Sequence, residues 1–133
     1  MNLIIDVGNT RIKAAVFEDD SLIALVVFEE KDLVLIVSTY SILRGIISSV
    51  TTVSNSSFKK IKELLPFMEL DAATKVPFSN LYKTPKTLGV DRIALAARAV
   101  KKYPNKNVLI IDAGTCITYD FVTSNKEYLG GAI

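Results

Sequence analysis

The sequence contains no histidine and only one cysteine, Cys116. The absence of histidine excludes a histidine general base, the Ser-His-Asp and Cys-His nucleophile pairs and every histidine metal site. A single cysteine excludes an internal disulfide and a zinc site built from cysteines, and it fits a reducing compartment. Any chemistry must therefore use carboxylates, hydroxyls, lysines and backbone amides.

Long apolar runs and a strong charge imbalance are also missing. The longest apolar run, residues 22–28, has the length of a strand and falls far short of the ~20 residues of a membrane helix. The first residues lack the basic segment of a signal peptide. The 16 Lys and Arg nearly balance the 14 Asp and Glu, and a net charge of +2 is too small to indicate nucleic-acid binding. We therefore expect a cytoplasmic protein without a membrane or nucleic-acid partner.

Half of the 133 residues are apolar, which is enough for a core of ordinary size. β-Branched and aromatic runs predict strands over residues 2–7, 12–17, 22–28, 44–50, 67–70, 116–122 and 127–133. Apolar spacing and capping residues predict helices over residues 32–43, 54–65 and 89–103. This pattern predicts an α/β fold with a mixed sheet.

Capping and apolar spacing define the first two helices in more detail. Asp32 is the expected N-cap of the first, and Ser54 or Asn55 that of the second. One face of the second helix is expected to pack, with Phe58, Ile61, Leu64 and Leu65. The connection over residues 71–88, which holds three of the four prolines, is expected to be irregular.

An internal repeat is the most informative feature of the sequence. Residues 3–8 read LIIDVG and residues 109–114 read LIIDAG, so that five of six positions are identical. A threonine follows each glycine, Thr10 in one copy and Thr115 in the other. A chance match is the alternative, because a strand ending in Asp before a glycine turn is common. The repeat favours two related β-hairpins from a duplicated fold.

The second copy has little sequence after it. The residues beyond Asp112 leave room for only two more strands, over 116–122 and 127–133. We therefore predict a first lobe over residues 1–103 and the opening β-meander of a second, truncated lobe over residues 107–133. With no later helix to cover it, the meander is expected to self-associate through its apolar strands and open edges.

The first hairpin has the residues of an anion site. Glycine in its turn lets backbone N–H groups approach an anion closely, and Asn9 and Thr10 add side-chain donors. Lys13 brings a positive charge, and Asp6 can hold a hydrated magnesium ion that bridges phosphates. The alternative is a plain β-turn with a solvated lysine.

Two further segments carry candidate chemistry. The hairpin at Asp112 and Thr115 repeats the first, and two such hairpins can clamp the phosphates of a nucleotide. Asp91 and Arg92 open the third helix, where a carboxylate can act as base for a substrate hydroxyl and an arginine can grip an anion. The alternative for this pair is a helix-start residue beside a surface ion pair.

Three motifs in this order resemble type III pantothenate kinase: Asp6-Val7-Gly8-Asn9-Thr10-x-x-Lys13, Tyr82-x-x-Pro85-x-x-Leu88-Gly89-x-Asp91-Arg92 and Asp112-Ala113-Gly114-Thr115. The resemblance covers the whole chain. It implies two ribonuclease-H-like lobes of the acetate and sugar kinase, heat-shock chaperone ATPase and actin superfamily. It also implies phosphorylation of pantothenate by ATP at the first step of coenzyme A synthesis, in a homodimer that uses Mg²⁺ and a monovalent cation (K⁺ or NH₄⁺).

The resemblance assigns a role to each motif. Asp91 would be the general base, Asp6 and Asp112 would hold the magnesium and the monovalent cation, and Thr115 would bind ATP. The ATP phosphates would also meet Asp6, Val7, Gly8, Asn9, Thr10, Arg11, Ile12 and Lys13. Pantothenate would meet Tyr82, Gly89, Val90, Asp91 and Arg92. The alternative function is a non-catalytic, self-associating half-protein that keeps the phosphate hairpins as a structural or regulatory module.

Overall fold

The computed structural model describes residues 1–8, 11–28, 33–50 and 56–133. It divides into two compact units, Met1–Leu70 and Asp71–Ile133, each with its own sheet and its own core. The α/β class with mixed sheets is confirmed. None of the helices in these ranges is long and apolar enough to cross a lipid bilayer.

The sheet of the first unit has the strand order β3-β2-β1-β4-β5. An antiparallel meander supplies β1 (Asn2–Val7), β2 (Ile12–Glu18) and β3 (Ser21–Phe28). The strands β4 (Arg44–Ser49) and β5 (Phe67–Glu69) extend the sheet in parallel on the other side of β1. Parallel neighbours need a crossover, which α1 (Leu33–Thr39) and α2 (Ser56–Leu64) provide.

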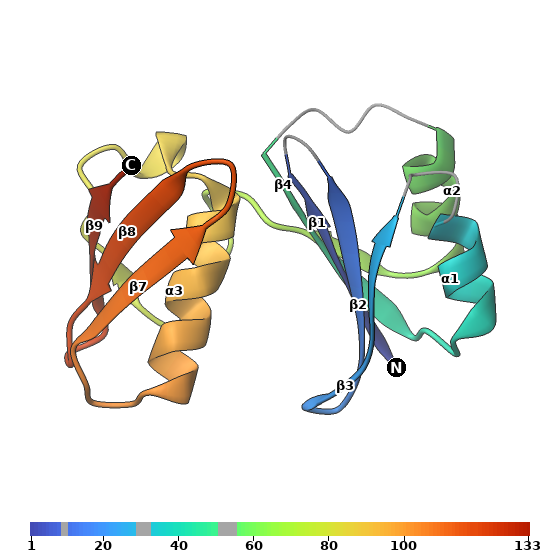
Figure 1. Cartoon of the computed structure of the whole chain (residues 1–133), viewed down its shortest axis with the longest axis horizontal. Helices are drawn as coiled ribbons and strands as arrows, with labels where there is room; N and C mark the ends of the chain where they lie inside the picture. The colour runs from blue at the N-terminus through green and yellow to red at the C-terminus, as the bar shows by residue number, and fades with distance from the viewer. Residues whose placement is uncertain (9–10, 29–32, 51–55) are drawn as a thin grey trace. The chain divides into compact units, whose positions relative to one another are not determined.

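Both helices of the first unit cover the same face of its sheet (Figure 1). Alternation along β1 buries Leu3 and Ile5 against Leu33 of α1 and Ile61 of α2. The predicted helices are longer than the observed ones, and Leu64 is exposed instead of packed because α2 ends at that residue. The expected caps, at residues 32, 54 and 55, lie outside the described residues.

The sheet of the second unit has the strand order β6-β9-β8-β7. Strands β7 (Val108–Ala113), β8 (Ile117–Val122) and β9 (Glu127–Ala132) form an antiparallel meander, as predicted. The two-residue strand β6 (Ser79–Asn80) runs parallel to β9, and a short 3₁₀ helix, η2 (Pro85–Thr87), follows it. The last helix is α3 (Val90–Lys102).

The helix α3 lies on the sheet of the second unit, so the expected division at residues 103 and 107 differs from the observed one (Figure 1). Its apolar stripe, with Ile93 and Ala96, packs in one cluster with Val122 and Tyr128 of the sheet. The expectation that no helix covers this meander is therefore wrong. The periodicity of α3 shows which face of the helix is apolar and not which sheet that face packs against.

The two meanders match in detail. In each, the pairing of the second strand with the third shifts register between the fifth and sixth residues of the second strand, at Val16/Phe17 and at Phe121/Val122. The connection over residues 114–116 is one residue shorter than the connection over 8–11. In the described part of the chain, β1 pairs on both sides whereas β7 pairs with β8 alone. These correspondences support the duplication that the repeat indicated.

Candidate functional site

The first hairpin presents its polar residues at the carboxyl end of β1. The N–H of Gly8 donates to the carbonyl of Arg11 at 3.1 Å, and a Cβ atom at Gly8 would lie 3.3 Å from that carbonyl. A side chain at this position would crowd that carbonyl, so the turn suits a glycine. Arg11 and Lys13 are exposed, and Val7 is buried opposite Ile12. Asn9 and Thr10 lie outside the described residues.

Asp6 has Lys13 as its antiparallel neighbour on β2 and Ser48 as its parallel neighbour on β4. Paired residues in a sheet present their side chains on the same face, so these three groups share one level of one face. A carboxylate, an ammonium and a hydroxyl are the groups that a hydrated cation and phosphate oxygens require.

Ser48 is a candidate that sequence reasoning missed. The residue is 7% exposed, and its Oγ makes no hydrogen bond to any described residue. A buried hydroxyl without a partner costs about 1–3 kcal/mol, so its presence beside Asp6 calls for an explanation. No sequence signal marks it, because its neighbour is set by the parallel register of β1 and β4 and not by spacing along the chain.

The second hairpin has the same outline but different chemistry. The N–H of Gly114 donates to the carbonyl of Cys116 at 2.9 Å, and Asp112, Thr115 and Cys116 are exposed. Thr118 stands where Lys13 stands in the first hairpin, opposite the aspartate. Since no described strand pairs with the other side of β7, Ser48 has no counterpart. Within the described ranges, no group of three or more acidic or cysteine side chains could hold a metal.

The start of α3 holds the candidate base in the second unit. Gly89 occupies the N-cap position and Val90 is the first helical residue. Asp91 is half-buried, and its Oδ1 accepts the N–H of Arg92 at 2.8 Å. A Cβ atom at Gly89 would lie 2.4 Å from that same Oδ1. The carboxylate therefore folds over the glycine and stands at the first turn, where an anion is favoured.

Arg92 points into the protein instead of presenting itself as a surface ion pair. Its Nε lies 3.1 Å and 3.0 Å from the two oxygens of Asp120, and its Nη2 lies 2.6 Å from Oδ1. The hydroxyl of Tyr128 donates to the same Oδ1 at 2.5 Å. All three side chains are buried. We call Arg92, Asp120 and Tyr128 the buried triad.

Electrostatics within the buried triad follow from these contacts. Hydrogen bonding to Asp120 raises the pKa of the Arg92 guanidinium above its ordinary value, although burial opposes this. Burial, and then the hydrogen bond to Asp120, raises the pKa of the Tyr128 phenol above its ordinary value. Both groups therefore stay protonated, Arg92 as a cation and Tyr128 as a neutral donor.

Tyr82 packs directly on this triad. The centroid of its ring lies 5.5 Å from Cζ of Arg92 and 6.3 Å from the ring centroid of Tyr128. Gly130 of β9 has a φ of 86°, and a Cβ atom there would lie 2.4 Å from Cδ2 of Tyr82. The glycine thus leaves the space that the ring fills. The structure therefore brings together Tyr82 and Arg92, and Asp91 directly precedes Arg92 in the chain.

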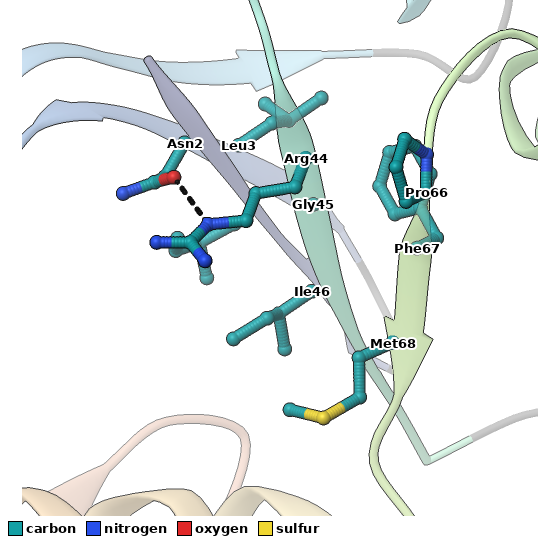
Figure 2. A pocket seen from close by; sticks show the side chains of 9 residues that line it. Asn2, Leu3, Arg44, Gly45, Ile46, Pro66, Phe67 and Met68 are labelled. Carbon is teal, nitrogen blue, oxygen red and sulfur yellow. Dashed lines mark hydrogen bonds between the residues drawn. The ribbon is translucent and has the colours of Figure 1, made fainter.

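A groove of about 450 Å³ lies on the first unit, at the opposite end of β1 and β4 from Asp6 and Ser48. Figure 2 shows Arg44 above Ile46 and Met68, with its Nε donating to Oδ1 of Asn2 at 3.0 Å. None of the predicted site residues lines this groove. It is therefore separate from the first hairpin.

Comparison with known proteins defines the family. The sequence profile of type III pantothenate kinase matches residues 2–133. The chain is 50% identical to a type III pantothenate kinase of Christiangramia forsetii and 47% identical to one of Flavobacterium johnsoniae, and each alignment covers all of this chain and 57% of the relative. A relative named likewise in Finegoldia magna is 37% identical over 98% of this chain and 56% of its own length.

This chain has an α/β fold with two glycine-turn hairpins, and these matches place it among the kinases. The protein belongs to the type III pantothenate kinase family. The chain spans a little more than half the length of these curated relatives.

Proposed function

We propose that this chain serves the ATP-dependent phosphorylation of pantothenate to 4′-phosphopantothenate in the cytoplasm, the first step of coenzyme A biosynthesis. The observation that carries the proposal is the half-buried Asp91 carboxylate at the start of α3, in a chain of this family. Asp91 directly precedes Arg92 of the buried triad, on which Tyr82 packs. Without any histidine in the sequence, a carboxylate is the natural base for an alcohol substrate.

In the proposed reaction the chain mainly positions groups and neutralises charge. Backbone N–H groups around Gly8, the Lys13 ammonium and Thr115 bind the ATP phosphates, with Val7, Asn9, Thr10, Arg11 and Ile12 completing the first hairpin. Asp91 accepts the proton of the pantothenate hydroxyl. At the same time the hydroxyl oxygen of pantothenate attacks the γ-phosphorus of ATP, and ADP leaves. Tyr82, Gly89, Val90 and Asp91 hold pantothenate, and the buried Arg92 contributes through its contact with Tyr82.

The donor set of the first hairpin fits a magnesium ion. Asp6 would hold a hydrated Mg²⁺. The hydroxyl of Ser48 beside it, which has no hydrogen-bond partner among the described residues, fits a water ligand of that ion or a phosphate oxygen. The ion would supply charge neutralisation on the phosphates. Asp112 is an exposed carboxylate at the second hairpin and would contact the monovalent cation, K⁺ or NH₄⁺.

A coupled ADP-release assay tests the proposal. Two proteins are compared: the 133-residue chain, and a chimaera that continues it with the remaining length of the Christiangramia forsetii relative. We expect ADP release that requires pantothenate in the chimaera. A folded chimaera that hydrolyses ATP equally with and without pantothenate would contradict the proposal.

Replacing Ser48 tests the phosphate end of the site. Ser48→Ala removes a buried hydroxyl that has no partner in the described part of the chain, so we expect the free energy of unfolding to stay unchanged or to rise by up to about 1 kcal/mol. The KM for ATP should rise roughly tenfold, because a hydrogen bond to a charged group is lost. Steady-state kinetics and urea unfolding measure the two effects. The control is Ser49→Ala, on the opposite face of β4. An equal rise in the KM for ATP in both variants would show that Ser48 has no specific role in binding ATP.

Replacing Gly89 tests the placement of the base. In Gly89→Ala the new methyl group meets Oδ1 of Asp91, and the carboxylate, at the end of a rotatable side chain, must turn away. We expect a loss in kcat of roughly 10–100-fold. The φ of −58° suits alanine, so stability should change by less than about 1 kcal/mol. Unchanged kcat in a folded variant would show that the carboxylate position does not matter.

Self-association is the second part of the proposal, and one observation also favours the alternative of a non-catalytic, self-associating half-protein. The face of the second sheet opposite α3 exposes Leu109, Ile111 and Ile117. Burying such a face in a two-fold dimer would be favourable. We expect sedimentation at micromolar concentration to show a dimer or a larger closed species, and Ile111→Lys to shift it toward monomer. A monomeric unmodified chain would contradict this part.

A further inference from the structure

We propose that Asp120 and Tyr128 are positioning residues for the substrate side of the active site, acting through Arg92 on Tyr82 and on the start of α3. The inference rests on the proposed function, in which Tyr82 and Asp91 meet pantothenate. Neither Asp120 nor Tyr128 belongs to any of the sequence motifs. Both come from the meander of the second unit, on β8 and β9.

The contacts form a continuous path. Tyr128 donates to Asp120 at 2.5 Å, and Asp120 accepts Nε and Nη2 of Arg92 at 2.6–3.1 Å. Arg92 lies under the Tyr82 ring at 5.5 Å and follows Asp91 directly in the first turn of α3. Two hydrogen-bonding nitrogens fix the plane of a guanidinium, whereas a single contact would let it rotate.

Stability alone does not explain a buried charge pair at this position. The surrounding cluster is apolar, with Ile93, Ala96, Val122 and Phe78. Taking a carboxylate and a guanidinium out of water costs enough that well-packed apolar residues often serve a core equally well. What the pair adds is geometry, because a fork of hydrogen bonds holds the first turn of α3 in one rotation relative to β8.

The pairing also revises what Arg92 does. Sequence reasoning expected it to grip an anion, but its guanidinium is neutralised by Asp120 and is 7% exposed. Its open side faces an aromatic ring, a contact that a cation stabilises. Arg92 therefore supports the Tyr82 ring, and Gly130 leaves the space that the ring fills.

Nuclear magnetic resonance of the 133-residue chain tests the path without any need for activity. In Tyr128→Phe and Asp120→Asn we expect the Tyr82 ring and Asp91 amide resonances to shift. Tyr119→Phe is the matched control, since Tyr119 is an exposed tyrosine on β8. Unshifted Tyr82 and Asp91 resonances in both test variants would overturn the inference.

Steady-state kinetics distinguish a positioning role from a role in folding alone. They are measured on whichever of the two proteins, the 133-residue chain or the chimaera, phosphorylates pantothenate. For Asp120→Asn we expect kcat/KM for pantothenate to fall on the order of 10²-fold, and for Tyr128→Phe less, with the KM for ATP unchanged. Equal loss toward both substrates would mean a structural role and overturn the inference. If the unmodified protein does not phosphorylate pantothenate, the proposed function fails, while the resonance shifts still decide the positioning path.

Discussion

The Asp91→Asn variant is expected to lose about 10²–10⁴-fold in kcat for pantothenate while keeping its fold. Asparagine has nearly the same shape and keeps a side-chain oxygen for the N–H of Arg92, which Asp91 now accepts at 2.8 Å. It cannot take the proton of the substrate hydroxyl. The loss should therefore appear in turnover and not in the free energy of unfolding.

The measurement is kcat in the ADP-release assay, with circular dichroism and urea unfolding to follow the fold. Asp112→Asn is an informative companion, because it alters an exposed carboxylate in the same unit that has no proposed role in proton transfer. It should keep most of its turnover at saturating monovalent cation. Near-normal kcat in Asp91→Asn would mean that Asp91 only begins the helix.

The Asp120→Ala variant is expected to lose about 3–5 kcal/mol in the free energy of unfolding. The substitution leaves the Arg92 guanidinium buried without its carboxylate and removes the acceptor of the Tyr128 hydroxyl. Neither group reaches water readily where it lies, since both are at most 7% exposed. Urea unfolding of the 133-residue chain measures the loss.

A double variant distinguishes two causes of this destabilisation, the loss of the attraction between the two ions and the burial of an unpaired Arg92 guanidinium. Arg92→Leu with Asp120→Leu replaces both ions by apolar groups, so it should be far more stable than Asp120→Ala. Asp112→Ala, which removes an exposed carboxylate on β7, should change stability little. A double variant as unstable as the single one would mean that the pair holds the unit together by attraction.

Local features of this fold follow from the sequence. Along the strands of both meanders, apolar and polar residues alternate or β-branched residues form runs. Glycines mark the hairpin turns. The repeat at residues 3–8 and 109–114 therefore predicted two related hairpins, and the structure confirms them as corresponding meanders. Asp91 at the start of a helix was predictable for the same reason, because capping and apolar spacing are local signals.

Features that depend on distant packing did not follow from the sequence. An apolar stripe on α3 fits either sheet, and only its contacts with Val122 and Tyr128 show which one it covers. Arg92 and Asp120 are 28 residues apart and share no motif. Ser48 reaches Asp6 through a parallel register that the chain does not encode locally. The candidate site was thus predictable in its motifs and not in its supporting residues.

The pairing of β6 with β9 bears on how the second unit folds during synthesis. Ser79 and Asn80 find their partners only at Glu127 and Tyr128, so the ribosome must make nearly the whole unit before its sheet can close. At usual elongation rates this takes on the order of seconds, a long time compared with helix formation. Until Asp120 has been synthesised, the Arg92 guanidinium stays hydrated. The apolar stripe of α3 then has no complete sheet to pack against. Pausing ahead of β8 would therefore prolong the exposure of Ile93 and Ala96 to aggregation and to chaperones.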